Sequence, residues 1–358
     1  MISLAAFGNQ LYYGTRSINF IKRRKIWYLF AVVILAVSIA GLATNGLKLG
    51  IEFRGGTEFI TQSDKPANEV RTELEDLGLQ QVIAQSVGSD RVSIQTEELT
   101  SAELAEVTNQ IAEITSSVAT EITVRSVGPT WGADITRTAL TGLLVFLVLV
   151  MIFLSIYFEF RMAVAAFIAL MHDLLVTIGV YALFGFEVTP ATAIGVLTIM
   201  GYSLYDTVVV FDKVKENVKG VTLQTGSTYA EAANLAVNQT VLRSINTSVV
   251  AILPVAGILF IGAFALRAST LQDLAIALFV GIAAGVYSSI FIATPILTDL
   301  KQSDPQIKVH NEKVAARREA IETTGIDPYA VTKSETRVKY AQQGGPRNQP
   351  KRKPRRLR

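Results

Sequence analysis

The stretch Gly201-Tyr202-Ser203-Leu204-Tyr205-Asp206-Thr207-Val208-Val209-Val210-Phe211-Asp212 places a carboxyl group inside apolar sequence. It closes an apolar run that begins near Pro190, so we expect Asp206 to lie in a helix long enough to cross a bilayer. A carboxylate at that depth costs roughly 2.5–3.5 kcal/mol on insertion scales. Such residues usually face a bundle interior or a wet cavity, often in a proton or ion path.

Helical spacing gives Asp206 polar neighbours on its own face. Tyr202 and Ser203 lie one turn before it, at the i−4 and i−3 positions. Two interpretations fit this arrangement. Asp206 either carries protons or ions, or it is a structural acid that is satisfied by a hydroxyl or an Arg on a neighbouring helix.

Composition decides the class of protein. Half of the 358 residues are hydrophobic, and five or more apolar runs have spanning length, which predicts an α-helical polytopic membrane protein. The chain has no cysteine and two histidines, so neither a disulfide framework nor a metal-ligand cluster is expected. Because no nucleophile–base pair or phosphate loop is evident either, we predict that the protein is not an enzyme and uses no cofactor.

Charge is distributed unevenly along the chain. Residues 1–25 hold five Lys/Arg and no acidic residue, residues 45–134 hold six against fifteen Asp/Glu, and residues 301–358 hold fifteen against six. Cytoplasmic segments of membrane proteins carry the excess of Lys and Arg. We therefore predict a cytoplasmic N-terminus, an extracytoplasmic domain at 45–134, six transmembrane helices and a cytoplasmic C-terminus.

Residues 1–25 are predicted to be a cytoplasmic segment, and residues 26–44 the first transmembrane helix. The basic run Lys22-Arg23-Arg24-Lys25 before an apolar run is also typical of a cleavable signal peptide. The apolar run is about 18 residues long, beyond the usual ~7–15 of a signal peptide, and it starts late. We favour an uncleaved span.

The acidic segment 45–134 shows the order βαββαβ of a ferredoxin-like split unit. Leu49–Thr61 alternates apolar and polar residues around Gly55-Gly56, which predicts a strand with a bulge or a close backbone approach. Thr100 is expected to cap the second helix. The other elements are predicted at Pro66–Leu77, Gln81–Val87, Arg91–Thr96 and Glu121–Val127.

Residues 138–300 are predicted to hold five further transmembrane helices, with a cytoplasmic segment at 213–245. The third span carries His172-Asp173 near its middle. This pair could shuttle protons, because His titrates near neutrality, or it could lock the packing between helices. Arg243 and Asn246 share one face of the helix that leads into the fifth span.

Residues 301–358 are polar and basic, and we expect a disordered cytoplasmic tail. The closing cluster Lys351–Arg358 could contact anionic lipid or ribosomal RNA. We favour a topology anchor, so nucleic acid is not expected as a partner.

Four stretches together resemble one known family. They are Gly50-Ile51-Glu52-Phe53-Arg54-Gly55-Gly56, Val127-Gly128-Pro129, Gly201–Asp212 with Lys215-Glu216-Asn217, and Asn238–Ser248. From about residue 15 to 300 the chain resembles the SecF family of the bacterial protein-export machinery, within the resistance–nodulation–division superfamily. Glu52 stands where the family usually has Asp, which keeps the charge, and the basic tail exceeds the usual ending.

The resemblance implies a six-span half that pairs with SecD in the bacterial cytoplasmic membrane. That unit assists the SecYEG channel and its SecA motor, commonly with YajC, and uses the proton-motive force to pull or release a preprotein on the outer side. Asp206 and Arg243 match the family's membrane-embedded acid and base. An Arg in reach favours the charged form of an Asp, so its engagement or withdrawal would switch protonation.

Two alternatives stay open. One is a small-molecule or lipid exporter of the same superfamily, although such exporters usually carry both halves in one chain with much larger outer domains. The other is a passive assembly scaffold in which Asp206 only holds helices together. Five further residues are expected to serve either in a proton relay or in helix packing: His172, Asp173, Tyr202, Ser203 and Asn246.

Overall fold

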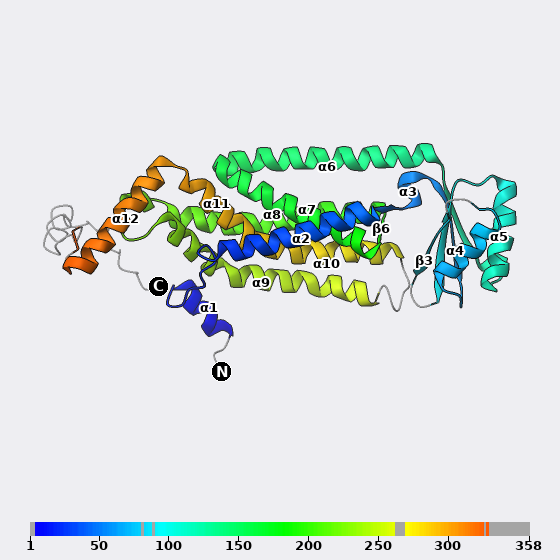
Figure 1. Cartoon of the computed structure of the whole chain (residues 1–358), viewed down its shortest axis with the longest axis horizontal. Coiled ribbons are helices and arrows are strands. Elements are labelled where there is room, and N and C mark those ends of the chain that lie inside the picture. Colours follow the sequence, from blue (N-terminus) through cyan, green and yellow to red (C-terminus); the bar gives the residue numbers. More distant parts are fainter. Residues whose placement is uncertain (1–3, 80–81, 88–89, 262–268, 326, 329–358) are drawn as a thin grey trace, which may run out of the picture.

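The computed structural model describes residues 4–79, 82–87, 90–261, 269–325 and 327–328. The molecule is elongated (Figure 1). Long helices form a bundle in its middle, a four-stranded sheet with two helices lies at one end, and helix α12 (Pro305–Thr324) lies at the other.

Within the described residues, six helical segments are long and apolar enough to cross a membrane. They are α2 (Arg24–Asn45), α6 (Pro129–Tyr157), α7 (Phe160–Phe184), α8 (Pro190–Val218), α9 (Tyr229–Ile261) and the run Leu271–Gln302. The last run comprises α10 (Ser269–Ser288), a π-helical turn η4 (Ser289–Ala293) and α11 (Thr294–Gln302). The predicted helical membrane protein with six candidate spans is confirmed.

The spans differ in how deeply they are buried. Half of the apolar window of α7 and 61% of that in Leu271–Gln302 is buried, against 11% in α6. Small residues allow the close approach of the inner helices. A Cβ on Gly179 of α7 would overlap the side chain of Ser38 on α2, and one on Gly281 of α10 would overlap Ile199 on α8. The helices α7, α8 and α10 therefore form the inside of the bundle.

The sheet domain follows the first span. Its elements are β2 (Gly56–Gln62), α4 (Ala67–Asp76), β3 (Ile83–Val87), β4 (Arg91–Thr96), α5 (Ser101–Thr115), a short 3-10 turn (Ala119–Glu121) and β5 (Thr123–Val127). The strands pair antiparallel in the order β3-β4-β2-β5. Thr100 caps α5 in a capping box with Glu103, as its sequence position predicts.

One apolar core holds this domain together. Phe59, Leu74, Ile94 and Ile111 are fully buried between the sheet and the two helices. Each such side chain contributes about 1.5–3 kcal/mol relative to exposure. The domain therefore has its own core, separate from the helix bundle.

The glycine pair changes the expected strand at Leu49–Thr61. The chain forms β1 (Lys48–Leu49), a helical turn α3 (Ile51–Arg54) and only then β2. Gly55 and Gly56 have φ of 79° and 128°, in the region that side chains disfavour. A Cβ on Gly56 would lie against the Thr96 carbonyl oxygen at the edge of the neighbouring strand, so the turn requires glycine.

Within the segment 213–245 the connection between α8 and α9 is short, because α8 continues to Val218 and α9 begins at Tyr229. A further expectation differs from the structure. Residues 305–324 form α12 where we expected disorder. That helix buries Ile307, His310 and Val314. Residues 329–358, with the closing basic cluster, lie outside the described residues.

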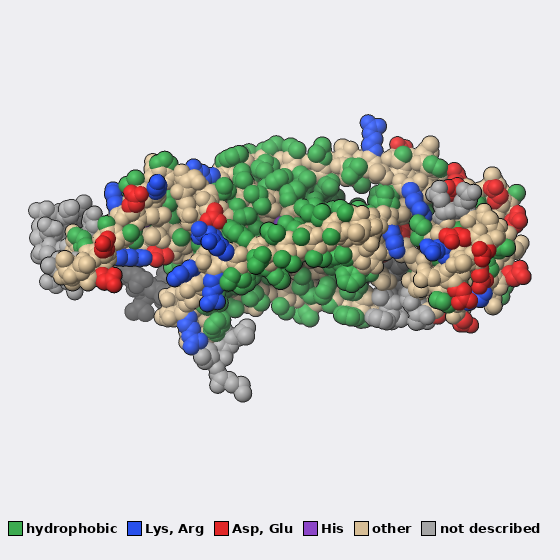
Figure 2. All heavy atoms as spheres, in the orientation of Figure 1, with side chains coloured by type: hydrophobic (Ala, Val, Ile, Leu, Met, Phe, Trp, Pro, Cys, Tyr) green, Lys and Arg blue, Asp and Glu red, His purple; other side chains and the backbone are tan. Residues whose placement is uncertain are grey.

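The distribution of side chains follows the architecture. Hydrophobic side chains cover the visible face of the bundle, acidic side chains gather on the sheet domain, and Lys and Arg gather around the opposite end (Figure 2). At that basic end, α1 (Leu4–Tyr12) packs against α9, and Gln239 donates a hydrogen bond to the Tyr12 carbonyl at 3.1 Å.

Candidate functional site

Two carboxyl groups are buried inside the bundle. Asp173 on α7 is 3% exposed and Asp206 on α8 is 4% exposed. The sequence places Asp206 one turn after Ser203, so both project from the same face of α8. Gly285 of α10 lies opposite, where a Cβ would come within 3.0 Å of the Ser203 Cβ. The close approach of α8 and α10 therefore encloses this face.

Asp173 joins three groups from three helices. Its Oδ2 accepts hydrogen bonds from Ser203 on α8, at 2.5 Å, and from Ser288 on α10, at 2.7 Å. Its Oδ1 lies 3.1 Å from the Nδ1 atom of His172, the preceding residue of α7. The carboxyl group thus ties α7, α8 and α10 together.

Asp206 is held in a similar way by Ser289, the residue that follows Ser288 in the sixth span. Ser289 donates to Asp206 Oδ2 at 2.6 Å. Ser289 also opens the π-helical turn, in which the regular helical hydrogen bonds are interrupted. Such turns inside helices occur frequently at functional sites. Neighbouring serines therefore hold the two carboxyl groups at the point where the sixth span departs from α-helical geometry.

Each serine has a second acceptor in reach. The Ser288 hydroxyl lies 3.2 Å from the Gly285 carbonyl oxygen, and the Ser289 hydroxyl lies 3.2 Å from that of Val286. A hydroxyl has one proton to donate and can also accept. Each serine can therefore donate to a charged carboxylate, or turn its proton to the backbone and accept from a protonated one.

Basic side chains are sparse here. Among the described residues, His172 is the one basic side chain within ion-pair distance of Asp173, and no Lys or Arg lies within that distance of Asp206. The Arg243 side chain is exposed on α9, and its carbonyl accepts from Thr247. Asn246 is exposed as well. The structure thus brings His172, Asp173, Ser203 and Asp206 together, and holds Arg243 and Asn246 at an exposed face.

Among the described residues, Nε2 of His172 is a buried polar atom of this site without a hydrogen-bond partner, and His172 is 5% exposed. The hydroxyl of Tyr202 is likewise buried without a partner, on a side chain that packs against the apolar cluster of Ile199, Val255 and Ile282. The ring of Tyr287 lies near His172, with ring centroids 6.0 Å apart. Unpaired buried polar groups are rare in proteins and call for an explanation.

Sequence reasoning missed Ser288 and Ser289. Both are buried at 0% exposure. The signal was present as two adjacent hydroxyls in a span otherwise rich in Gly and Ala. Helical spacing relates residues within one helix, however, and these contacts join residues more than 80 positions apart.

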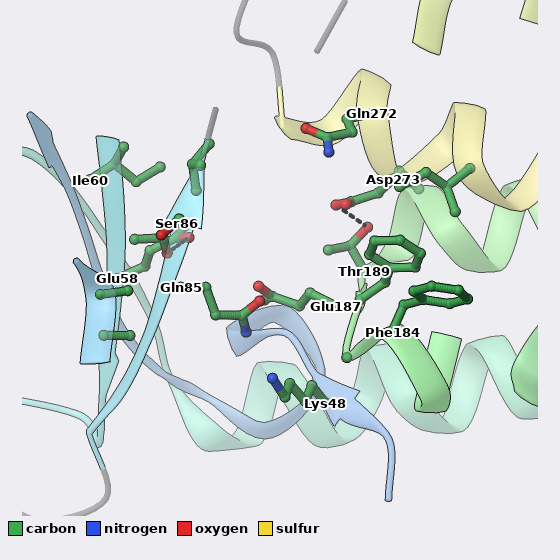
Figure 3. A pocket seen from close by; sticks show the side chains of 18 of the residues that line it. Lys48, Glu58, Ile60, Gln85, Ser86, Phe184, Glu187, Thr189, Gln272 and Asp273 are labelled. Atoms are coloured by element: carbon green, nitrogen blue, oxygen red, sulfur yellow. Dashed lines mark hydrogen bonds between the residues drawn. The ribbon is translucent and has the colours of Figure 1, made fainter. Parts of the chain in front are cut away.

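A second acidic group lies between the sheet domain and the bundle. A cavity of about 670 Å³ lies there, and Figure 3 shows side chains that line it. Glu58 and Gln85 line it from the sheet, and Glu187, Thr189 and Asp273 line it from the bundle. Thr189 donates to Asp273 across the ends of α8 and α10, at 3.3 Å.

Glu187 links the two parts of the molecule. It lies in β6 (Glu187–Val188), which pairs parallel with β1 and sets Lys48 opposite Glu187. Gln95 of the sheet donates to Glu187 Oε1 at 2.7 Å, and Arg54 donates to Gln95 at 2.9 Å. The pKa of Glu187 is raised from 4.5 to about 7, chiefly by burial. The Gln95 bond lowers this pKa, whereas the nearby charges of Glu58 and Glu52 contribute to the rise.

Arg125 lies beside two further carboxylates of this junction. It lies 3.3 Å from Glu52 and 3.6 Å from Glu58, and Ser93 donates to Glu58 at 2.7 Å. One guanidinium group thus pairs with both carboxylates.

The glycine motif forms the mechanical part of this junction. The Gly50 N–H donates to the Val188 carbonyl at 3.0 Å. Gly128 is the N-cap of α6, and Pro129 is its first residue. A Cβ on Gly55 would meet the Pro129 backbone, which shows how closely the glycine turn packs on the start of α6.

Comparisons with known proteins agree with these features. The family described as "Protein export membrane protein SecD/SecF, C-terminal" matches residues 106–303, and the SecD/SecF GG motif matches residues 40–67. Protein translocase subunit SecF of Streptomyces coelicolor is 48% identical over 320 residues, which cover 89% of this chain and 86% of that protein. The subunit of the same name from Mycobacterium tuberculosis is 41% identical over 334 residues, covering 90% and 76%.

A solved structure shares the architecture. SecDF, a translocon-associated membrane protein from Thermus thermophilus, superposes with a TM-score of 0.72 at 28% identity, over 80% of this chain. The matched part is 39% of the SecDF chain. With its glycine motif, its six candidate spans and close relatives that carry one name, the chain belongs to the SecF family of protein translocase subunits.

Proposed function

We propose that this chain is the SecF half of a SecD–SecF unit in the bacterial cytoplasmic membrane and that it uses the proton-motive force to assist preprotein translocation. The observation that carries the proposal is the pair Asp173 and Asp206, buried where α7, α8 and α10 meet. A buried carboxyl group without a strong cation partner is costly when charged and far less so when protonated. One proton therefore separates two states of the bundle.

The proton gradient supplies enough energy for such a switch. A proton that crosses about 100 mV yields about 2.3 kcal/mol. That energy changes the ratio of two conformations by about fiftyfold. Asp206 is the proposed proton carrier, because it faces the interior of a predicted span and is bonded to the π-helical turn of another.

Arg243 is the proposed regulator of that carrier. It lies on α9, which packs against α8 and α10. In the conformation described here its side chain is exposed. The proposed cycle brings it to Asp206 in a second conformation, where its charge favours release of the proton. Tyr202 and Asn246 remain candidates for support of that state.

The sheet domain is the proposed handle on the preprotein. Its element order β2-α4-β3-β4-α5-β5 and its antiparallel sheet support assignment to the ferredoxin-like class. We place it on the extracytoplasmic side and both termini in the cytoplasm. The basic residues at the opposite end of the bundle support this orientation.

The proposed partners follow from the exposed helix faces and from the family. Helix α6 presents large apolar side chains outward, among them Leu140, Leu144 and Ile156. A second membrane subunit of the SecD kind can cover such a face, and the solved SecDF chain contains more sequence than this protein provides. The SecYEG channel, SecA and YajC are the further proposed partners.

The deciding experiment replaces Asp206 by Asn in the complete export complex. Asn keeps the size and the acceptor for Ser289 but cannot cycle a proton. We expect gradient-stimulated preprotein translocation in membrane vesicles to fall to the level without a gradient, with normal subunit levels on a blot. Asp212→Asn, at an exposed position of the same helix, is the matched control and should be neutral. Near-normal stimulation in Asp206→Asn would leave the scaffold as the better interpretation.

A further inference from the structure

We propose that Asp173 is a second proton-carrying carboxyl group, that it exchanges its proton through His172, and that Ser288 and Ser289 couple it to Asp206. The inference rests on the proposed function and deepens it, because it assigns a role to groups beyond Asp206. Its starting point is the way in which hydroxyls, rather than Lys or Arg, hold both carboxyl groups.

The geometry at Asp173 divides its two oxygens between two tasks. Oδ2 accepts both serine hydrogen bonds, and the imidazole is the one hydrogen-bond partner of Oδ1 among the described residues. Two hydroxyl donors on Oδ2 suit a carboxylate. Oδ1 is consequently the oxygen at which a proton can be added or removed without breaking the bonds between helices.

His172 is placed to perform that exchange. Its Nδ1 lies 3.1 Å from Oδ1, and its Nε2 is buried without a partner. A proton added at Nε2 makes imidazolium, which then gives its Nδ1 proton to Asp173 Oδ1. The products are a neutral carboxylic acid and a neutral imidazole that carries its proton on Nε2. The reverse sequence removes the proton from Asp173 and returns both side chains to their starting protonation states.

The serines couple this event to Asp206. Ser288 and Ser289 are adjacent, and each can turn its proton from the carboxylate to a backbone carbonyl 3.2 Å away. At Asp206, a protonated carboxyl group can then donate to the Ser289 oxygen. At Asp173, a proton on Oδ1 removes the negative charge from the carboxyl group and so weakens Oδ2 as an acceptor for Ser288. The reversal occurs at the first residue of the π-helical turn, where α10 is least constrained by its own hydrogen bonds. The sixth span thereby senses the protonation of both carboxyl groups.

His172 on α7 contacts Asp173, and the ring of Tyr287 on α10 lies near His172. Among the described residues no Lys or Arg forms an ion pair with either carboxyl group.

The first test separates proton carriage from helix packing. Asp173→Asn keeps an acceptor for Ser203 and Ser288 but cannot carry a proton. We expect it to lose gradient-stimulated translocation in vesicles that contain the complete export complex, with unchanged subunit levels. Asp173→Glu should retain part of the stimulation with a shifted pH profile, and Asp212→Asn should behave as wild type. Normal stimulation in Asp173→Asn would overturn the inference.

A serine variant decides the matter if Asp173→Asn lowers the subunit levels. Ser203→Ala/Ser288→Ala removes both hydroxyl locks and keeps the carboxyl group. If the levels persist while the stimulation falls, the hydroxyls serve coupling rather than assembly, as proposed. If the levels collapse as in Asp173→Asn, the residue serves packing and the inference is wrong.

The second test reads the proton directly. At about pH 7 exposed carboxylates with ordinary pKa values near 4 are ionised, so a remaining carboxylic-acid infrared band reports sheltered groups. In the purified complex of Asp206→Asn we expect a component of that band, beside the contribution of Glu187, that is missing in Asp173→Asn/Asp206→Asn. Identical spectra of the two variants across the pH range would overturn the inference.

The two proposals fail in distinguishable ways. Normal stimulation in Asp206→Asn rejects proton use by this half altogether. Loss of stimulation in Asp206→Asn together with normal stimulation in Asp173→Asn rejects only the second carrier.

Discussion

The molecule has two groups of carboxylates, and they are neutralised in different ways. In the junction beneath the sheet domain, Glu52 and Glu58 lie beside Arg125, and Glu187 accepts from the amide of Gln95. Inside the bundle, serine hydroxyls and one imidazole surround the carboxyl groups. Both groups are buried in part, but only the junction contains guanidinium groups.

This difference separates docking from transport. A carboxylate beside an Arg keeps its charge over a wide pH range, so it can hold two surfaces together but is a poor proton carrier. A carboxyl group held by hydroxyls can be satisfied in either protonation state, because a hydroxyl both donates and accepts. The junction suits a fixed connection, and the bundle site suits a change of state.

The largest effect should come from placing a cation beside a carboxyl group of the bundle, as Arg125 lies beside the carboxylates of the junction. Ser289→Lys places an ammonium group beside Asp206, and an opposite charge within about 4–6 Å favours the ionised form. We expect gradient-stimulated translocation to be abolished although Asp206 is intact. Ser289→Met is the matched control, because it adds similar volume at this buried position without charge. Equal activities of the two variants in vesicles would show that charge at this site is immaterial.

The sequence singled out the two buried carboxyl groups but not all of their hydrogen-bond partners. Asp206 could be found because a carboxyl group inside an apolar run is costly, and His172-Asp173 drew attention for the same reason. The serines of the sixth span escaped prediction, since which helix faces which is decided by packing between distant segments. Helical spacing likewise grouped Arg243 with Asn246 but could not show that the bundle leaves this face exposed.

The fold was likewise predicted only in part from the sequence. Apolar runs of spanning length sufficed to predict the six helical segments, and the Thr100 cap was readable from one residue. The strand expected at Leu49–Thr61 is broken by α3, because alternation of apolar and polar residues does not reveal the φ that Gly55 and Gly56 adopt. Helix α12 was missed because charge outweighed the spacing of Ile307, His310 and Val314, which lie on one helical face.

The junction should respond to pH through Glu187, with a smaller effect. Its pKa is raised from 4.5 to about 7, chiefly by burial, so the docked state binds a proton more tightly than the undocked state. Docking is therefore strongest below about pH 4.5 and weakens as the pH rises to about 7, by at most about 3 kcal/mol. Hydrogen exchange of the β1 and β6 amides between pH 4 and 8, corrected for intrinsic rates, measures this effect.

A neutral isostere tests the assignment to Glu187. Glu187→Gln should flatten the pH dependence of the corrected exchange rates, because the docked and undocked states then bind equal numbers of protons at this position. Glu97→Gln changes an exposed acid at the end of β4 and should leave the slope as in wild type. A slope that survives in Glu187→Gln would assign the pH response to another group.

The smallest effect is expected when the guanidinium group of Arg125 is removed from the junction. The Arg125 side chain is 49% exposed, and exposed ion pairs typically contribute about 0–1 kcal/mol. Arg125→Ala should lower the free energy of unfolding of the sheet domain by at most about 1 kcal/mol, because Ser93 still donates to Glu58. Gradient-stimulated translocation should stay near the wild-type level.

The control for Arg125 is Arg71 of α4, whose guanidinium lies 3.7 Å from exposed Glu75 of the same helix. Arg71→Ala removes an arginine of similar exposure, 47% against 49%, that does not line the junction cavity. Denaturant unfolding should find the two variants within about 1 kcal/mol of each other. A loss of gradient stimulation in Arg125→Ala alone, as large as that expected for Asp206→Asn, would mean that the junction carboxylates take part in proton transfer. The separation of docking from transport would then fail, because unpaired Glu52 and Glu58 would compete for the protons that the bundle site is proposed to receive.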